Sequence, residues 1–359
     1  MKVIIAGGGT GGHLFPGVAV AEEFMRRDGA NRILFIGTKR GVEAAILPQL
    51  GLELATLDVA GIKGKGFGDM VKALCKIPQS LGRSFRIIRD FGPDILIGVG
   101  GYASGPAVLA ACCMGVKTAV MEQNALPGVT NKILGRIVDR AFVSFEETRK
   151  AFPGKKVLLT GNPIRADFMK DMGKNEDKRD PFTVLVFGGS QGAHRINMMF
   201  LEALKFLKMD GAKPRIIHQT GNADFEAVRR AYGQLGVEAD VRPFIQDMPR
   251  VFRSADLLVC RAGATSIAEI TASGKAAILI PFPHAVHDHQ TKNAEVLARA
   301  GAAILAPEGD LTAEGLARII DDLRMNPRRI REMSERSRAL GNARAAADIV
   351  DECLRLVAA

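Results

Sequence analysis

Three glycine-rich segments have the residue types and spacing that are best suited to binding a ligand. They span 7–12, 100–105 and 188–193, and each follows a short apolar run. Glycine lets backbone N–H groups come close to an anion, and a helix that begins after such a turn adds the positive end of its dipole. The pattern therefore predicts a protein that holds phosphate-bearing molecules. A lone histidine, His13, follows the first segment, where a bound anion and a neighbouring hydroxyl would sit, although such a histidine is usually structural.

The first segment also matches a dinucleotide-binding fingerprint, Gly7-x-Gly9-x-x-Gly12. That fingerprint requires an acidic residue at the end of the second strand to hold a ribose. The expected second strand instead ends in Ile36-Gly37-Thr38. A nicotinamide-dependent oxidoreductase is therefore a disfavoured alternative.

A second candidate binding turn spans residues 260–270, CRAGATSIAEI. Thr265 and Ser266 could donate hydrogen bonds to a phosphate, and Glu269 lies one turn further on, where a carboxylate could accept two ribose hydroxyls. The same residues also suit an ordinary capped helix whose glutamate complements the dipole. The spacing alone leaves these two interpretations equal.

Three histidines, His284, His287 and His289, surround Asp288 in the segment PFPHAVHDHQTKNAEVL. A zinc site is disfavoured because no cysteine pair accompanies them. A polar binding loop ahead of a helix, with Gln290 and Asn293 as hydrogen-bonding amides, is the favoured interpretation. No Asp-x-Asp pair occurs in the chain, so the usual carboxylate clamp for a metal-bound nucleotide sugar is missing.

The elements that must position these residues follow from apolar runs that alternate with helical patterns. This alternation predicts βαβ units and parallel sheets buried on both faces. A hydrophilic stretch, 170–181, is expected to link two similar α/β halves, and 342–359 should form an amphipathic helix that packs on either half. The expected strands are 3–6, 32–36, 95–99, 118–121, 141–143 and 157–160, then 183–187, 215–219, 237–242, 257–260, 276–280 and 302–305.

The composition favours acidic partners. The 359 residues suit two domains, and 49 basic against 39 acidic residues give a net charge of +10. Such a charge suits nucleotides, nucleic acid or an anionic membrane. Aromatic residues make up only 6% of the chain, with no tryptophan, so stacking platforms are scarce and no nucleic-acid partner is expected.

Cysteine usage and the first residues favour a cytosolic protein. The five cysteines are odd in number and lie mostly in apolar surroundings, so buried thiols are expected rather than disulfides. The chain begins with a strand, so no signal peptide is expected. The uncharged stretch 95–116 could span a bilayer by length. Glycines and Pro106 interrupt it, however, and favour a strand, a turn and a buried helix.

Residues 62–89 combine basic and apolar side chains and allow two interpretations. By composition they suit an ordinary amphipathic helix with a solvated basic face. They would equally suit docking on a membrane surface. The basic residues are Lys63, Lys65, Lys72, Lys76, Arg83, Arg86 and Arg89, and the apolar ones are Ile62, Phe67, Met70, Leu74, Ile77, Leu81, Phe85, Ile87 and Ile88.

Seven motifs together resemble the MurG family of N-acetylglucosaminyltransferases, which complete lipid II in bacterial cell-wall synthesis. The resemblance implies a GT-B fold, an α/β architecture of two Rossmann-like parallel-sheet domains facing across a cleft. It implies an acceptor and membrane domain over 1–165, a donor domain over 166–340, and a helix over 341–359 that returns to the first domain. The motifs run in family order as GGGTGGHLFPGVAVAEE (7–23), GGYASGP (100–106), EQNALPGVTNK (122–132), GNPIR (161–165), GGSQGA (188–193), CRAGATSIAEI (260–270) and PFPHAVHDHQTKNA (281–294).

The resemblance implies an inverting transfer of GlcNAc from UDP-GlcNAc to the 4-hydroxyl of undecaprenyl-diphospho-MurNAc-pentapeptide (lipid I), which gives lipid II. His13 is the candidate general base, because an ordinary histidine pKa of about 6.5 suits proton removal near neutral pH. No metal and no cofactor are expected, since amides at a helix N-terminus can stabilise the departing diphosphate. Arg165 or Arg261 could add a cation.

The resemblance also implies two sets of binding residues. Glu269 would hold the ribose, Ile245 would contact the uracil through its backbone, and Gln290 would reach the GlcNAc or the diphosphate. The expected donor residues are Thr10, Gly11, Gly12, Asn124, Arg165, Ser190, Ile245, Ala264, Thr265, Ser266, Glu269 and Gln290. Those expected at the acceptor diphosphate are Gly9, Thr10, Gly101, Tyr102 and Ser104.

The acceptor's lipid tail makes membrane docking through 62–89 the favoured interpretation of that segment. The expected partners are UDP-GlcNAc, lipid I, the anionic cytoplasmic face of the bacterial membrane and other cell-wall or division proteins. Competing classes are another GT-B enzyme such as a glycolipid synthase or a UDP-GlcNAc epimerase, a nicotinamide-dependent oxidoreductase, and a protein that binds nucleotide sugar or membrane without catalysis. Acceptor turnover, NAD binding and UDP release would separate them.

Overall fold

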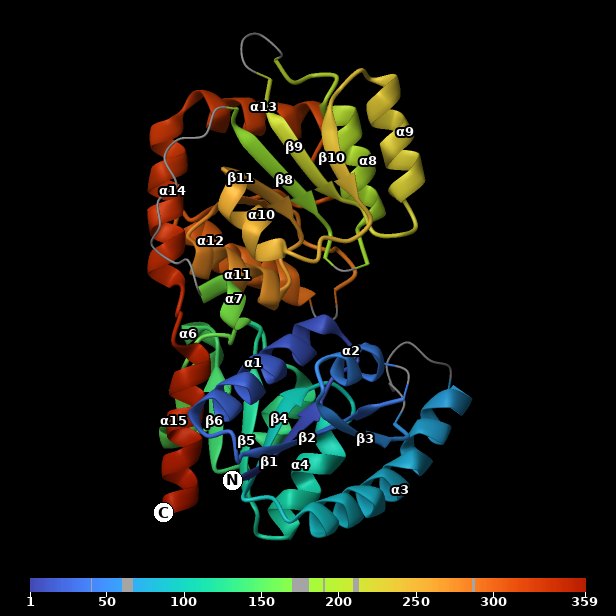
Figure 1. The fold of residues 1–359 in the computed structure, drawn as a ribbon, viewed down its shortest axis with the longest axis vertical. Helices are drawn as coiled ribbons and strands as arrows, with labels where there is room; N and C mark the ends of the chain where they lie inside the picture. Colours follow the sequence, from blue (N-terminus) through green and yellow to red (C-terminus); the bar gives the residue numbers. More distant parts are fainter. Residues whose placement is uncertain (40, 60–66, 170–180, 190, 209–212, 286–287) are drawn as a thin grey trace. The chain divides into compact units, whose positions relative to one another are not determined.

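The computed structural model describes the chain except residues 40, 60–66, 170–180, 190, 209–212 and 286–287, and it also leaves out the side chains of 67–77, 155, 166 and 169. The chain divides into two compact units (Figure 1). Unit 1 comprises Met1–Ala166 and Ala343–Ala359, and unit 2 comprises Asp167–Asn342. The helix α7 (Ala166–Met169) lies at the point in the chain where the units divide.

Unit 1 is built on a seven-stranded sheet in the order β3-β2-β1-β4-β5-β6-β7, and every pairing is parallel. Its helices cover both faces (Figure 1). The strands are β1 (Lys2–Gly7), β2 (Arg32–Thr38), β3 (Glu53–Leu57), β4 (Ile95–Gly100), β5 (Lys117–Glu122), β6 (Arg140–Val143) and β7 (Val157–Leu159). The helices are α1 (Gly11–Arg27), α2 (Glu43–Gln49), α3 (Phe67–Phe91), α4 (Ser104–Cys113), α5 (Val129–Leu134), α6 (Glu146–Arg149), the 3-10 turn η1 (Gly154–Lys156) and α15 (Ala345–Ala358).

Strand alternation gives unit 1 two apolar cores. Val3 and Ile5 of β1 point to the face covered by α1 and α15, whereas Ile4 and Ala6 point to the face covered by α3, α4 and α5. The last helix belongs to the first of these cores through Ile349. Ion pairs of 2.6 Å from Arg27 to Asp351 and from Arg140 to Glu352 add to the docking of this helix on unit 1.

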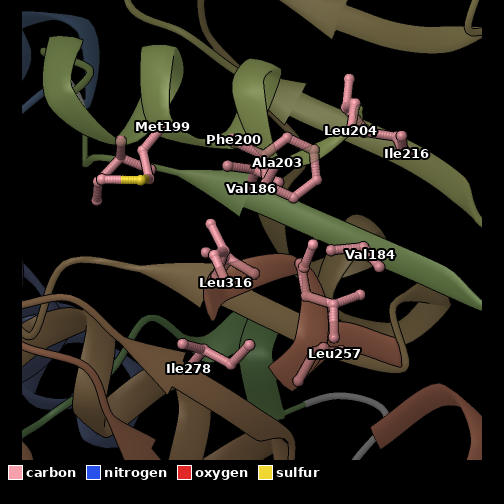
Figure 2. Packing of buried hydrophobic residues seen from close by; sticks show 14 of the residues in the cluster. Val184, Val186, Met199, Phe200, Ala203, Leu204, Ile216, Leu257, Ile278 and Leu316 are labelled. Atoms are coloured by element: carbon pink, nitrogen blue, oxygen red, sulfur yellow. The ribbon is translucent and has the colours of Figure 1, made fainter. Parts of the chain in front are cut away.

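Unit 2 is built on a six-stranded parallel sheet in the order β10-β9-β8-β11-β12-β13. Figure 2 shows its core, where Phe200 of α8 packs near Val186 of β8. The strands are β8 (Thr183–Phe187), β9 (Arg215–Gln219), β10 (Ala239–Arg242), β11 (Leu257–Cys260), β12 (Ala276–Leu279) and β13 (Ala303–Leu305). The helices are α8 (His194–Ala203), α9 (Phe225–Gln234), α10 (Met248–Ser254), α11 (Ala264–Ser273), α12 (His289–Arg299), α13 (Ala313–Met325) and α14 (Pro327–Leu340).

The predicted alternation of strands and helices and the parallel sheets are confirmed, with one strand missed. The missed strand, β3 (Glu53–Leu57), lies at the edge of its sheet and is half-buried, so it lacks the long apolar run of the central strands. The stretch 95–116 forms β4, a turn and α4 as predicted, and no helix in the described part of the chain is long and apolar enough to cross a membrane. Cys260 and Cys353 are buried, but Cys113 is exposed because it ends α4.

Candidate functional site

The first glycine-rich segment rests on a buried carboxylate that the sequence analysis missed. Glu43, at the start of α2, is fully buried, and its Oε2 accepts a 2.8 Å hydrogen bond from the Gly9 N–H. Its Oε1 accepts from the N–H and the hydroxyl of Thr38, both at 2.8 Å. Three glycines make room for this carboxylate, because a Cβ on Gly8, Gly37 or Gly41 would lie within 3 Å of it. Glu43 therefore fixes the path of the chain between β1 and α1.

The first two glycine-rich segments pack against each other through their backbones. Gly8 N–H donates to the Gly100 carbonyl at 3.2 Å. A Cβ on Gly7 would lie 2.2 Å from the Gly100 carbonyl oxygen, and one on Gly101 would lie 2.3 Å from that of Gly8. These glycines are therefore required for contact between the loops, whereas Gly9, with a φ of +88° and nothing within 4 Å of its would-be Cβ, faces open space.

His13 lies in the first turn of α1, as predicted, and its imidazole is held by a buried amide. Its Nδ1 lies 3.2 Å from Oε1 of Gln123, which directly follows β5. Gln123 is 1% exposed, and its Nε2 donates a 3.0 Å hydrogen bond to the Val99 carbonyl. The ring also lies against Gly100, where a Cβ would come within 2.7 Å of Nδ1. Gln123 lies in the motif at 122–132 but was not among the predicted site residues; its signal was a polar side chain at the carboxyl end of a buried strand.

The residues expected at the acceptor diphosphate occupy different environments. Thr10 is exposed and precedes α1, and Tyr102 is 57% exposed. The Gly9 amide is already committed to Glu43, so it is not a free donor to a phosphate. Ser104 was also expected at the diphosphate, but it is fully buried and its Oγ packs against Gly98. Any contact of Ser104 with the acceptor diphosphate would therefore come from its backbone at the start of α4.

Asn124 lies in a loop that a second buried carboxylate organises. Glu122 is 3% exposed, and its Oε1 accepts hydrogen bonds from the Asn124 N–H at 3.1 Å and from Asn124 Nδ2 at 3.3 Å. Its Oε2 accepts from the Gly128 N–H at 3.0 Å and from Asn131 Nδ2 at 2.9 Å. This set of bonds fixes the chain between β5 and α5, next to Gln123.

Two expected cationic residues are engaged by the protein itself. The Arg165 guanidinium lies 5.5 Å from the centre of the Phe15 ring on α1, within unit 1. Arg261 was a second candidate cation, but it is only 8% exposed and donates to the carbonyls of Ile280 and Pro281 at 3.1 and 3.0 Å. It also forms a 2.6 Å ion pair with Glu308. Arg261 therefore ties loops of unit 2 together, and its charge is already balanced.

In unit 2 a buried amide joins the third glycine-rich segment to the stretch that contains Ile245. Gln219, the last residue of β9, donates from Nε2 to the Gly189 carbonyl at 3.0 Å and accepts from the Ile245 N–H at 2.7 Å. A backbone contact from Ile245 to a base would therefore fall on its carbonyl. Ser190, an expected donor residue, lies outside the described residues.

The predicted turn after β11 forms as expected and places its polar residues at the start of a helix. Gly263 precedes α11, which begins at Ala264, and Thr265 and Ser266 lie half-buried in its first turn. Glu269 is half-buried further along the helix. Burial raises the pKa of the nearby Cys260 thiol, and the Glu269 charge adds to this shift, which keeps the thiol neutral. The amides of the first turn and the Glu269 carboxylate could together receive a phosphate and a diol.

The histidine-containing loop is built as a turn that leads into α12. Gln290 Oε1 accepts from the Phe282 N–H at 2.9 Å, which leaves its Nε2 as a donor. Asn293 is fully buried and donates to the Ala262 carbonyl at 3.2 Å, so it joins this helix to the turn after β11. His287 lies outside the described residues. Among the residues that are described, no group of three or more His, Cys, Asp or Glu side chains could hold a metal ion.

A buried polar chain behind the third glycine-rich segment was also missed. Asn197 Nδ2 donates to the Thr220 carbonyl at 2.9 Å and to Asp224 Oδ2 at 2.8 Å, so its Oδ1 must accept a hydrogen from His218 Nε2, 3.0 Å away. His218 Nδ1 then accepts from the Tyr232 hydroxyl at 3.0 Å. Burial lowers the pKa of His218 to about 3, so this histidine is neutral and structural.

The chain matches known proteins over nearly its whole length. Residues 3–143 match the glycosyltransferase family 28 N-terminal domain, and residues 183–352 match the glycosyltransferase family 28 C-terminal domain. A relative from Syntrophus aciditrophicus, named UDP-N-acetylglucosamine–N-acetylmuramyl-(pentapeptide) pyrophosphoryl-undecaprenol N-acetylglucosamine transferase, is 57% identical over 357 residues, or 99% of each chain. A Myxococcus xanthus protein of the same name is 50% identical over 99% of this chain and 93% of its own.

A solved structure agrees with these relatives. The crystal structure of Acinetobacter baumannii MurG matches with a TM-score of 0.81 at 31% identity, over 99% of both chains. The predicted fold class, a GT-B fold of two Rossmann-like parallel-sheet domains, and the resemblance to MurG are thereby confirmed. The chain belongs to glycosyltransferase family 28, within its MurG group.

Proposed function

We propose that this protein transfers GlcNAc from UDP-GlcNAc to the 4-hydroxyl of undecaprenyl-diphospho-MurNAc-pentapeptide, lipid I, and so forms lipid II. The observation that carries the proposal is the full-length similarity, 57% identity, to a transferase whose name states this reaction. The chemistry of unit 1 supports it, because His13 lies in the first turn of α1, and the start of a helix attracts an anion through its backbone N–H groups and the positive end of its dipole. His13 would be the base, and the backbone N–H groups in the same first turn of α1 would bind the anion.

The reaction is a single inverting displacement. The His13 imidazole takes the proton of the 4-hydroxyl while the hydroxyl oxygen attacks the anomeric carbon of UDP-α-GlcNAc. The bond from that carbon to the diphosphate oxygen breaks, and its electron pair leaves with UDP. Negative charge grows on the diphosphate in the transition state, and amides fixed at a helix N-terminus can stabilise it without reorganising.

We assign the donor mainly to unit 2 and the acceptor to unit 1. In unit 2, the first turn of α11 would take the diphosphate, Glu269 the ribose, the Ile245 carbonyl the uracil and Gln290 Nε2 the sugar or the diphosphate. Thr10, Gly11, Gly12, Asn124 and Arg165 of unit 1 would complete the donor site, and Ser190 would join it. The acceptor diphosphate would lie at Thr10, Gly101 and Tyr102.

We propose that the enzyme needs no metal ion. A phosphate at the start of α1 or α11 would meet backbone N–H groups and the positive end of a helix dipole, which reduces the need for a cation. Activity should therefore survive EDTA, and added Mg²⁺ should change the rate by at most about twofold. Loss of activity on chelation, restored by one divalent ion, would instead indicate a metal at the histidine-containing loop.

The direct test of the transfer is UDP release from UDP-GlcNAc with a short-chain lipid I analogue. UDP should form only with both substrates, and His13→Ala should reduce kcat by about 10²–10⁴-fold while the donor KM changes little. Cys113→Ser serves as a control, because this exposed residue at the end of α4 takes no part in the proposed site. A folded His13→Ala variant with near-normal turnover would remove His13 from the mechanism, and binding of NAD without competition by UDP would overturn the proposed function.

We further propose that unit 1 docks on the cytoplasmic face of the membrane. Arg83, Arg86 and Arg89 on α3 are exposed, whereas Leu81 and Ile88 pack into the core of unit 1, as do Phe85 and Ile87. The apolar side chains of 81–88 therefore contribute to the core of unit 1, Ile88 fully and Leu81, Phe85 and Ile87 in part. Lys63 and Lys65 lie outside the described residues, as do the side chains of Lys72 and Lys76.

An exposed apolar row on and just after α5 offers the apolar part of such a surface. Val129, Ile133 and Ile137 are 54%, 61% and 47% exposed and recur every four residues, with exposed Lys132 and Arg136 between them. Val129 and Ile133 belong to α5. This helix lies on the same face of the sheet as α3, and α4 packs against both. Apolar side chains flanked by lysine and arginine suit the interface of an anionic bilayer.

Vesicle binding tests this surface. Each Lys or Arg near an anionic leaflet contributes about 1 kcal/mol, so Arg83→Glu with Arg86→Glu should weaken binding to anionic vesicles at least about tenfold. Activity on long-chain lipid I should fall, and activity on a soluble acceptor should be spared. Arg229→Glu on α9, an exposed charge of unit 2, is the matched control. Equal loss on both acceptors would mean that α3 supports the fold or the acceptor site.

A further inference from the structure

We propose that Gln123 is a positioning residue that selects the tautomer of His13 and so makes Nε2 the basic atom. The inference rests on the proposed function, in which His13 is the general base. A neutral imidazole carries one hydrogen, on Nδ1 or on Nε2, and only the bare nitrogen can accept a proton from a substrate. A histidine that must accept a proton on one particular ring nitrogen therefore needs a neighbouring group that holds the hydrogen on the other nitrogen.

The orientation of the Gln123 amide is set from behind. Its Nε2 donates to the Val99 carbonyl at 3.0 Å, and that bond is buried. Turning the amide over would place its oxygen against the carbonyl oxygen of Val99, and two acceptors would then face each other without a hydrogen between them. Because Gln123 is 1% exposed, water cannot relieve that contact. Oε1 is therefore fixed towards His13.

An amide oxygen only accepts hydrogen bonds. Since Oε1 lies 3.2 Å from His13 Nδ1, the hydrogen must lie on Nδ1, and Nε2 keeps its lone pair. Rotating the ring by half a turn would bring a C–H group to Oε1 and leave a buried acceptor without a partner. The ring is further confined by the Gly100 backbone, which approaches Nδ1 closely enough that a Cβ would lie 2.7 Å away.

The neutral charge of Gln123 matters as much as its position. A carboxylate at the same place would fix the same tautomer, but it would also stabilise the imidazolium formed after proton uptake. An amide orders the ring without adding this negative charge. We therefore expect Gln123 to act on the turnover step and to leave donor binding nearly unchanged, because its side chain bonds to the base and to the Val99 carbonyl, both within unit 1.

The tautomer can be measured directly on the full chain. The protein contains six histidines, so ¹⁵N-histidine labelling gives a resolvable spectrum, and His13→Ala assigns the His13 signals. At pH 8 an ordinary histidine is neutral. The wild-type protein should show a protonated Nδ1 and a bare Nε2 at His13. A protonated Nε2 in the wild-type protein would overturn the inference without any variant.

Gln123→Leu then tests the cause. It should give averaged shifts of two exchanging tautomers and should lower kcat roughly 10- to 100-fold, with the donor KM within about twofold, as for misplacement of a catalytic group. Thr118→Val is the matched control, because it deletes a buried polar group near the start of β5, whereas Gln123 directly follows the end of that strand. An unchanged tautomer with unchanged kcat in Gln123→Leu would overturn the inference.

These outcomes separate the inference from the proposed function. If the wild-type protein releases no UDP from UDP-GlcNAc and lipid I, the proposed function fails, whatever the tautomer. If the wild-type protein is active but His13 carries its hydrogen on Nε2, the role of Gln123 alone fails.

Discussion

Replacing Gly100 by alanine should disable the enzyme by moving one imidazole ring. Gly100 ends β4 with a φ of +93°, and a Cβ built on it would lie 2.7 Å from Nδ1 and 2.8 Å from Cε1 of His13. Ordinary van der Waals contact begins at 3.4 Å. The ring must therefore withdraw by about 0.7 Å, which exceeds the tolerance of about 0.5 Å for a catalytic group. The same movement strains the 3.2 Å bond from Nδ1 to Gln123.

The expected consequence is a fall in kcat of roughly 10²-fold, since a misplacement of about 1 Å can cost this much. The positive φ adds backbone strain of about 1–3 kcal/mol to the folded state, so stability must be measured alongside activity. UDP release with saturating donor and acceptor gives kcat, and thermal unfolding gives stability.

Gly115→Ala supplies the matched control. Gly115 has a φ of +71° and nothing within 4 Å of its would-be Cβ, so its alanine variant carries comparable backbone strain without the contact to His13. Stability should fall in both variants, and kcat only in Gly100→Ala. Comparable kcat values in the two folded variants would refute the argument that Gly100 is required by the position of the imidazole.

Three further predictions concern single polar side chains. Burial lowers the pKa of His218 to about 3 from an unfolded value of about 6.5, so the unfolded state binds the additional proton and the free energy of unfolding should fall by about 2 kcal/mol between pH 7 and pH 5. His218→Gln should abolish this loss in urea titrations and Tyr232→Phe should retain it; equal pH dependence in wild type and His218→Gln would contradict the assignment. Glu43→Gln should cost about 1–3 kcal/mol in unfolding free energy and lower kcat, because one amide hydrogen would then face the Gly9 or Thr38 donors; an unchanged melting temperature would argue against this role. Glu269→Ala should raise the donor KM roughly tenfold or more with little change in kcat, as expected for a lost charge-assisted bond, and a fall in kcat alone would place Glu269 in the chemical step.

Much of the site was predictable because its signals are local. A glycine-rich turn between an apolar strand and a helix can be recognised from about ten consecutive residues. All three such turns form as predicted, apart from Ser190, which lies outside the described residues. The residues that hold these turns in place were missed. Glu43 and the two amides, Gln123 and Gln219, looked like ordinary polar residues beside buried strands, because their partners are 34, 110 and 30 positions away in the chain.

The tertiary structure also reassigned residues whose type alone had suggested a role. Arg261 is a cation near a proposed phosphate site, but its guanidinium meets two carbonyls and a carboxylate within unit 2. Ser104 lies in a glycine-rich segment, but its hydroxyl is buried against Gly98 of β4. A buried charge such as that of Arg261 is used by its nearest partners, and the chain sequence does not reveal which partners are nearest.

The sequence by itself determined that the chain forms parallel α/β units with phosphate-binding turns, because strand burial, helix starts and glycine conformations depend on neighbouring residues. It also determined the family, because seven motifs recur in order. Only the tertiary structure decided that Glu43 takes the Gly9 amide and which way the His13 ring faces. Those features depend on hydrogen bonds between strand ends far apart in the chain, and such bonds exist only when parallel strands bring their carboxyl ends to one edge of a sheet.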